Sequence, residues 1–286
     1  MDDKQLLMKF QKAEITEHHI YTKLAEKVQG KNREILKGIA NDEKRHYKIF
    51  KNLTKEEVKP DRWKIFWYTL LSKLFGLVFS LKVMERGEKL AQSEYERIVN
   101  KYPVVKGVID DEEKHELKLI ELIEEERVGY ISSMVLGLND AIVELTGALA
   151  GFTFALRESK LVGLAGLITG VSAALSMAVS EYLSEKSEVE HTKNPLKAAI
   201  YTGIAYILVV ILLILPFFLI PNPYFSLGVA ASTVVVIIAV FTYYVAVIKD
   251  ESYKRLFLEM LILSFSVMVV SFIVGVVARK VLGIEI

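Results

Sequence analysis

The chain has 286 residues, of which 52% are hydrophobic, and its mean hydropathy of +0.33 exceeds that of an ordinary soluble domain. The formal net charge of +1 gives no indication of a nucleic-acid partner, and the lack of cysteine excludes disulfides, thiolate metal sites and iron–sulfur clusters. Residues 1–127 hold 26 of the 36 Lys and Arg and 24 of the 35 Asp and Glu. This asymmetry predicts a soluble domain over 1–127 and a membrane domain over 128–286.

Apolar residues recur at helical spacing through the first half, so we expect an all-α domain. The first helix is predicted over 5–28, where Gly30 follows as a stop signal, and the second over 31–53. A third is expected to continue to about residue 101, before Pro103, and a fourth to span 104–126. The N-terminus has no apolar core of signal-peptide length, which predicts a cytoplasmic location for this domain.

Residues 63–84 are strongly apolar but include Lys64, Lys73 and Lys82. One interpretation is a buried crossover that leads into the third helix. The other is a segment on the membrane surface, with its lysines directed at anionic headgroups. A transmembrane span is disfavoured because Lys73 would lie near its centre, so the contact of 63–84 with the membrane stays open.

A repeat across the four predicted helices carries the chemistry of this half. The first and third helices hold a Glu followed seven residues later by a Tyr, and the second and fourth hold a Glu-x-x-His pair. The residues are Glu14 and Tyr21, Glu88 and Tyr95, Glu43 and His46, and Glu112 and His115. Residues three apart lie one turn above each other, so a Glu and a His can bind one ion together. The set is that of di-iron carboxylate bundles and suits Fe(II) or Mn(II).

This half resembles the ferritin-like, rubrerythrin-type superfamily over nearly its whole length. The positions that carry the resemblance are Glu14, Glu43, His46, Glu88, Glu112 and His115. The resemblance implies a four-helix domain with a di-iron cofactor, in which Glu85 is a further ligand as in rubrerythrin. Glu17 and His18 lie close to these positions and are predicted to face solvent.

Five membrane spans are expected in the second half, over 130–156, 161–183, 198–220, 225–248 and 257–282. Loops on the side of the soluble domain carry six Lys and Arg, against four on the opposite side. The positive-inside rule then predicts the N-terminal domain in the cytoplasm and the C-terminus outside. We expect an integral membrane protein of a prokaryotic cell membrane.

The first span contains Asp140 and Glu144, which lie four residues apart and therefore on one helical face. Carboxylates within a span are costly and usually functional, so both are predicted to line a transport pathway. Two glycine pairs, 147 with 151 and 166 with 170, allow close helix approach. They indicate either ordinary packing or the seam of a homodimer.

The second span ends with carboxylates at helical spacing, namely Glu181, Glu185 and Glu188, with Met177 one turn inside Glu181. They form either an exposed helix end or a vestibule that attracts cations at the cytoplasmic mouth of a pathway. A thioether such as that of Met177 is more often a packing group than a ligand.

The membrane half resembles the vacuolar iron transporter family over 128–286. The motifs that carry the resemblance are Asn139-Asp140-Ala-Ile-Val-Glu144 and Ser176-Met177 followed by Glu181. Members are five-helix dimers that move Fe(II), and often Mn(II), out of the cytosol against protons. The resemblance implies that Asp140 and Met177 are pathway residues and Glu144 a helper. Here Asn139, Ala141 and Leu145 replace the family's Ser, Gly and Pro, and the loop over 185–195 is too short for extra metal-binding helices.

The two halves in this order resemble the membrane-bound ferritin group. The resulting hypothesis is a transporter that exports Fe(II) or Mn(II) by proton antiport, with a ferritin-like domain that captures, oxidises or senses the metal. The alternative is a membrane-tethered di-iron ferroxidase or peroxidase whose spans are an anchor. A third is a sensor or storage module that gates the membrane part.

Overall fold

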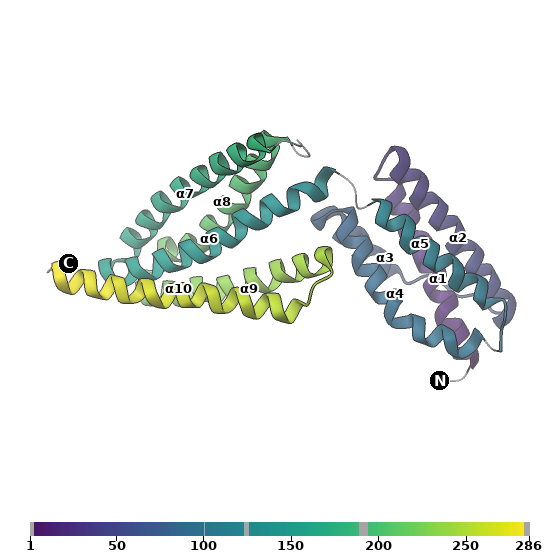
Figure 1. Ribbon diagram of the computed structural model, residues 1–286. Helices are drawn as coiled ribbons and strands as arrows, with labels where there is room; N and C mark the ends of the chain where they lie inside the picture. The colour runs from purple at the N-terminus through teal and green to yellow at the C-terminus, as the bar shows by residue number, and fades with distance from the viewer. Residues whose placement is uncertain (1–2, 100, 123–125, 189–193, 283–286) are drawn as a thin grey trace. The chain divides into compact units, whose positions relative to one another are not determined.

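The computed structural model describes the backbone of residues 3–99, 101–122, 126–188 and 194–282, and their side chains except those of 88–98, 116, 120–122, 126–129 and 282. The described chain is all-α, as the sequence predicted (Figure 1). It divides into two compact units, Met1–Glu125 and Glu126–Ile286.

The first unit contains α1 (Asp3–Ala25), α2 (Gly30–Thr54), α3 (Arg62–Phe75), α4 (Leu77–Val99) and α5 (Val105–Leu122) (Figure 1). α1 packs along α2 and α3, α2 packs on α5, and α4 packs on α3 and α5. One apolar cluster centres on Ile20, Leu24, Leu36 and Ile39, all fully buried. A second, which includes Phe10 and Phe50, fixes the first turns of α1 against the end of α2.

The apolar stretch over 63–84 forms two helices, because Gly76 has a φ of 91°, a left-handed value that glycine adopts readily. α3 begins at a side-chain cap, since Asp61 accepts hydrogen bonds from the backbone N–H groups of Trp63 and Lys64. Trp63 is 70% exposed, so the prediction of a buried crossover is wrong for α3. Only the inner side of α3, with Ile65 and Leu71, is buried.

The second unit contains α6 (Glu126–Leu156), α7 (Ser159–Ser187), α8 (Pro195–Leu219), α9 (Pro223–Lys249) and α10 (Tyr253–Leu282). All five are long and apolar enough to cross a membrane, which confirms that the second half contains five membrane-capable helices. Asn194 and Asn222 cap α8 and α9, and each is followed by a proline at the first helical position, where a missing N–H costs nothing.

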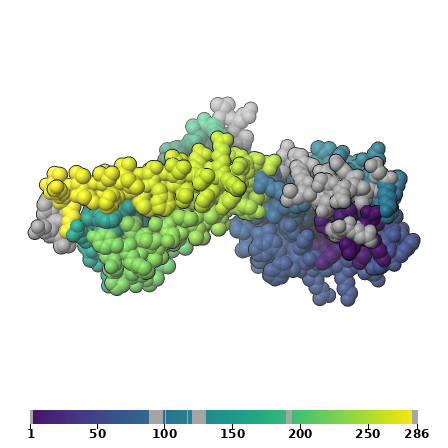
Figure 2. Space-filling model, turned by 90° about the horizontal axis from the view of Figure 1, so that it is seen from below, coloured from purple at the N-terminus to yellow at the C-terminus, as the bar shows by residue number. Residues whose placement is uncertain are grey.

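α6 and α8 share the most deeply buried core of this unit, with Ile142, Leu145, Tyr206 and Leu213 each at most 1% exposed. α10 lies on the outside of the bundle, along one face of the second unit (Figure 2). It packs on α6 and α9.

The glycine pairs bring helices of the same chain together. A Cβ built on Gly147 would meet Val267 and Ser271 of α10, and one built on Gly170 would meet Val210 of α8. Gly151 and Gly166 likewise face Ser271 and Leu149. The structure therefore accounts for both pairs by packing within the chain, which is the first of the two alternatives.

Candidate metal site and membrane carboxylates

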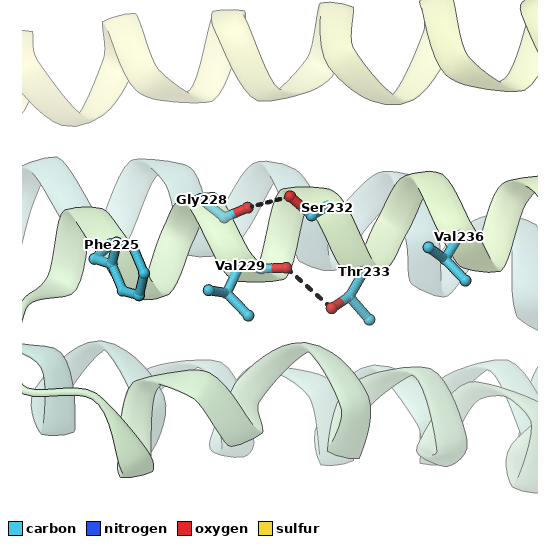
Figure 3. Close-up of a pocket in the computed structure, with 6 residues that line it drawn as sticks. All are labelled: Phe225, Gly228, Val229, Ser232, Thr233 and Val236. Atoms are coloured by element: carbon cyan, nitrogen blue, oxygen red, sulfur yellow. Dashed lines mark hydrogen bonds between the residues drawn. The ribbon is translucent and has the colours of Figure 1, made fainter.

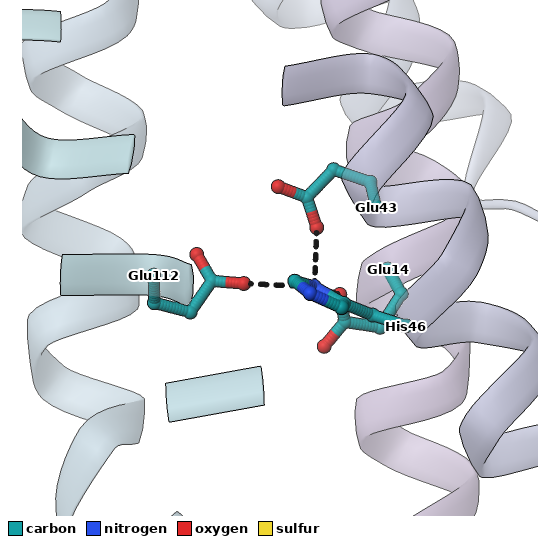
Figure 4. Close-up of side chains that lie close together, drawn as sticks. All are labelled: Glu14, Glu43, His46 and Glu112. Carbon is teal, nitrogen blue, oxygen red and sulfur yellow. Dashed lines mark ion pairs between the residues drawn. The ribbon is translucent and has the colours of Figure 1, made fainter. Parts of the chain in front are cut away.

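Three helices of the first unit bring four metal-ligating side chains together: Glu14 from α1, Glu43 and His46 from α2, and Glu112 from α5. One ligand atom of each lies within 4.8 Å of those of the other three (Figure 4). The first three residues are buried and Glu112 is half-buried. The spacing of three residues aligns Glu43 with His46 on one face of α2.

His115 on α5 completes a nearly symmetric arrangement. The Nδ1 atom of His46 lies 3.5 Å from Glu43 Oε2 and 3.2 Å from Glu112 Oε1. The Nδ1 atom of His115 lies 3.1 Å from Glu43 Oε1 and 3.5 Å from Glu112 Oε2. The two imidazole rings are stacked with their centroids 5.9 Å apart. The carboxylates of Glu43 and Glu112 thus each present one oxygen to each imidazole. In addition, Glu14 Oε2 lies 3.4 Å from His46 Nδ1.

These atoms fit a metal centre better than a hydrogen-bonded core. Within the part of the chain that the structure describes, buried atoms without a hydrogen bond include the Nδ1 atoms of His46 and His115, Glu43 Oε2 and Glu112 Oε1. Buried polar atoms are normally hydrogen-bonded, and leaving several unsatisfied in one place is costly. Divalent ions bound by carboxylate and imidazole ligands would satisfy all of them.

The other nitrogen of each imidazole contacts an aspartate from the opposite helix. His115 Nε2 lies 3.1 Å from Asp42 Oδ2 on α2, and His46 Nε2 lies 3.4 Å from Asp111 Oδ2 on α5. Arg45 contacts both aspartates, at 3.0 Å from Asp42 and 2.6 Å from Asp111. Such carboxylate–histidine contacts orient a ligating imidazole and raise its basicity. Our sequence interpretation assigned neither aspartate a role, although an Asp precedes the Glu in both repeats.

The electrostatics of this cluster favour protonated imidazoles when no metal is bound. Burial lowers the pKa of His46, but contacts with Glu112, Glu14 and Glu43 outweigh it and raise that pKa to about 12. For His115 burial is likewise outweighed by Glu112 and Glu43, and its pKa rises to about 10. Metal binding therefore has to displace protons from both side chains.

The carboxyl groups of the cluster respond differently from one another. Burial raises the pKa of Glu14 well above its usual value, and the negative charges of Glu43 and Glu112 add to the rise. The same burial acts on Glu43, but contacts with His115 and His46 outweigh it and lower the pKa of Glu43 to about 2. Glu43 is thus the ionised centre of the cluster, with one imidazole on each side.

The remaining predicted residues of the first unit do not belong to this cluster as the structure describes it. Glu85 is half-buried on α4 and, among the described residues, does not belong to the group within 4.8 Å. The side chains of Glu88 and Tyr95 lie outside the described residues. The prediction that Glu17 faces solvent is wrong, because this side chain is half-buried. Burial raises its pKa, and so do the charges of Glu43 and Glu14.

In the second unit, Asp140 and Glu144 lie on α6 as predicted from their spacing. Asp140 is half-buried, and Glu144 is exposed on the surface of its unit. The hydroxyl of Tyr206 on α8 donates a 2.8 Å hydrogen bond to Glu144 Oε2, and the ring of Tyr206 is fully buried. The sequence interpretation missed Tyr206, which is one of several aromatic residues in its span.

A further carboxylate lies on α10. Because Gly147 faces Val267 and Gly151 faces Ser271, α6 and α10 run parallel, and Glu259 falls at the level of Asp140. Glu259 is exposed on the surface of the unit. Glu259 could have been found from the sequence, because it is an acidic residue within an otherwise apolar stretch of α10. Our sequence interpretation did not include it.

The predicted vestibule residues do not share one environment. Glu181 and Glu185 on α7 are buried, with 8% and 5% exposed, whereas Glu188 is exposed at the end of the helix. Met177 packs against the apolar core that includes Ala141 and Tyr206. A role of these four residues in a pathway stays a prediction.

A surface pocket of about 520 Å³ lies along α9, away from these carboxylates in the chain (Figure 3). Its lining contains no ionisable side chain, and its two hydroxyls are already bonded within the helix. Ser232 donates to Gly228 O and Thr233 to Val229 O, each at 2.9 Å. The residues that line the pocket therefore offer no charged ligand for an ion.

Membrane-capable helices with carboxylates inside their apolar stretches are typical of proteins that move ions across a bilayer. The model of the VIT family matches residues 131–196 and 189–276, just over half of the chain. The chain therefore belongs to the VIT family of membrane metal-ion transporters. The match leaves residues 1–130 and 277–286 uncovered. None of the curated proteins compared with the chain matches it.

Proposed function

We propose that this protein exports Fe(II), and Mn(II) as a second substrate, from the cytosol through its membrane unit in exchange for protons. The observation that carries the proposal is the pair Asp140 and Glu144 within a membrane-capable helix of a VIT family member. A divalent cation needs anionic oxygens to replace its water at mid-bilayer, and these carboxylates supply them. A carboxylate that releases a metal ion can take up a proton, which would couple the two movements in opposite directions.

We further propose that two copies assemble around these carboxylates. Glu144 is exposed on the surface of its unit, where a charge facing hydrocarbon would be costly. A second copy of the membrane unit would bury this side chain and give the ion ligands from two chains. The excess of Lys and Arg in the loops on one side supports a cytoplasmic first unit and an external C-terminus.

The first unit is proposed to be a ferritin-like di-iron domain. The residues that would hold the metal are Glu14, Glu43, His46, Glu112 and His115, with Glu85 and Glu88 of α4 as the remaining candidates. The buried, unsatisfied ligand atoms support this role. A bound di-iron centre would supply Fe(II) capture and oxidation. Capture, oxidation and sensing of the metal all require the same ligands. Both delivery of metal to the membrane unit and gating of that unit are therefore compatible with this ligand set.

The buried Glu and His cluster also supports a second candidate, a membrane-tethered di-iron ferroxidase or peroxidase. In that case the helices of the second unit would be an anchor. An anchor has no need of carboxylates in its apolar stretches, and membership of a transporter family favours transport.

Anaerobic Fe(II) uptake into proteoliposomes, with a chelating dye inside and an imposed pH gradient, separates the two candidates. Uptake that follows the gradient is expected for proton-coupled transport. Oxygen consumption on addition of Fe(II), without any uptake under anaerobic conditions, would identify the tethered oxidase and refute the transporter proposal.

A further inference from the structure

The outward face of α3 is an unusual surface for a domain rich in charged residues. Four large apolar side chains point away from the first unit: Trp63, Phe66, Trp67 and Leu74, with 70%, 54%, 46% and 65% of their surfaces exposed. Contiguous exposed apolar patches of this kind mark sites of interaction with a partner or a membrane.

Helical geometry places these residues in one stripe. At 100° per residue, positions 63, 66, 67, 70 and 74 fall within about one-third of the circumference of α3. Ile65 lies on the inward side of the helix and Leu71 at the edge of the stripe, and both are buried. Lys64 and Lys73 are exposed and lie on the two opposite flanks of the stripe. An apolar face bordered on both sides by cations is the arrangement of helices that lie in the plane of a bilayer surface.

Other cations gather beside the end of α3. Lys27 donates a 3.0 Å hydrogen bond to Thr69 O, which places its ammonium group against the helix. Desolvation lowers the pKa of Lys27, and repulsion from Lys73 and Lys23 lowers it further. Lysines that repel one another in this way offer a ready site for anionic groups, and the phospholipid headgroups of a cytoplasmic leaflet are anionic.

We propose that α3 is an in-plane membrane anchor, which inserts Trp63, Phe66, Trp67 and Leu74 into the bilayer interface while Lys64 and Lys73 bind anionic headgroups. Tryptophan favours the level of the headgroups, where its ring is apolar and its N–H remains accessible to polar partners. The membrane-capable helices that begin at Tyr130 keep the first unit close to a bilayer, so a weak surface helix suffices. This inference does not depend on ion transport.

The anchor connects directly to the helix that carries part of the metal cluster. Asp61, which caps α3, lies 3.4 Å from Lys12, and its backbone N–H donates a 2.9 Å hydrogen bond to Thr16 Oγ1. Lys12 and Thr16 lie two residues on either side of Glu14. Seating α3 in the interface would therefore fix the height of α1, and with it the metal cluster, above the membrane surface.

The test uses the intrinsic fluorescence of the full-length protein. The chain has two tryptophans, and both lie on this face, so their emission reports on α3 alone. The protein is reconstituted into vesicles of phosphatidylcholine with phosphatidylglycerol, with or without acyl chains brominated near the headgroup. We expect the brominated lipid to quench roughly half or more of the emission, because interfacial helices bury their apolar face about 5–10 Å deep.

Two variants keep both tryptophans. Leu74→Asp places a charge within the stripe, near the end of α3, and is expected to lower the quenching at least about threefold. Leu117→Asp is the matched control, since Leu117 is an equally exposed leucine of the same unit, on α5, and it should leave quenching unchanged. Replacing Lys64 and Lys73 by alanine should weaken quenching in vesicles that contain the anionic lipid more than in neutral ones.

Two results would overturn the proposal. Emission that is quenched by aqueous acrylamide but not by brominated lipid would show that the stripe faces water. Emission shielded from both quenchers would show that protein covers it, either a second copy or another part of the same chain. Because no ion flux is measured, either outcome leaves the transport proposal untouched.

Discussion

The aspartates behind the imidazoles provide the sharpest test of the metal cluster. Replacing Asp42 by Asn keeps the shape of the side chain but removes the charge that holds His115 Nε2 at 3.1 Å. Loss of such an outer contact typically lowers metal affinity by about 10- to 100-fold, or about 1.4–2.7 kcal/mol. Asp111 contacts His46 at a longer 3.4 Å, and its contacts with Arg45 and Lys114, at 2.6 Å and 2.9 Å, are closer than those of Asp42 with Arg45 and Lys118, at 3.0 Å and 3.9 Å. We therefore expect metal affinity to fall about 100-fold in Asp42→Asn and about tenfold in Asp111→Asn.

The assay is Mn(II) binding to the full-length protein in detergent, measured by competition with a chelator. Asp110→Asn is the control, because Asp110 is exposed and directly precedes Asp111. A double variant, His46→Ala with His115→Ala, defines any binding elsewhere in the chain. Equal affinities for Asp42→Asn and Asp110→Asn would refute the view that these aspartates orient metal ligands.

Three further expectations concern pH, the membrane carboxylates and helix packing. Without metal, the raised imidazole pKa values stabilise the first unit fully below pH 6.5, the ordinary pKa of histidine. This contribution is lost as the pH rises through about 10 for His115 and about 12 for His46, so the unfolding midpoint, followed by tryptophan emission, should fall above pH 6.5. Tyr206→Phe removes the donor to Glu144 and should slow ion flux severalfold while Mn(II) binding to the first unit is unchanged. A Cβ on Gly275 would collide with the carbonyl oxygen of Gly151, so Gly275→Ala should lower the stability of the membrane unit by about 1–3 kcal/mol, measured by thermal unfolding. Gly228→Ala is the control and should leave the stability unchanged, because a Cβ on Gly228 would meet nothing within 4 Å.

What could be predicted from the sequence is what depends on local spacing. The five membrane-capable helices follow from the length of their apolar stretches alone. The pairs Glu43 with His46 and Glu112 with His115 could be recognised because partners three residues apart share one helical face. The all-α class followed from helical periodicity in the same way.

What could not be predicted depends on contacts between distant helices. Asp42 meets His115 across 73 positions of sequence, and no spacing rule connects them. The glycines of α6 suited either a dimer seam or packing, and only the position of α10 distinguishes these alternatives. The division of residues 63–84 into two helices depends on the left-handed backbone of Gly76. The residues on both sides of Gly76 are apolar, so the sequence pattern gives no sign that a helix ends there.

The central claim is that Asp140 lies on the ion pathway of a transporter. Its most direct test is anaerobic Fe(II) flux in proteoliposomes under a pH gradient, with the wild-type chain, Asp140→Asn, and Glu251→Gln, a control at an exposed carboxylate between α9 and α10. We expect Asp140→Asn to abolish the flux while the first unit still binds metal, and Glu251→Gln to transport normally. Undiminished flux in Asp140→Asn would contradict the assignment of this carboxylate to the pathway.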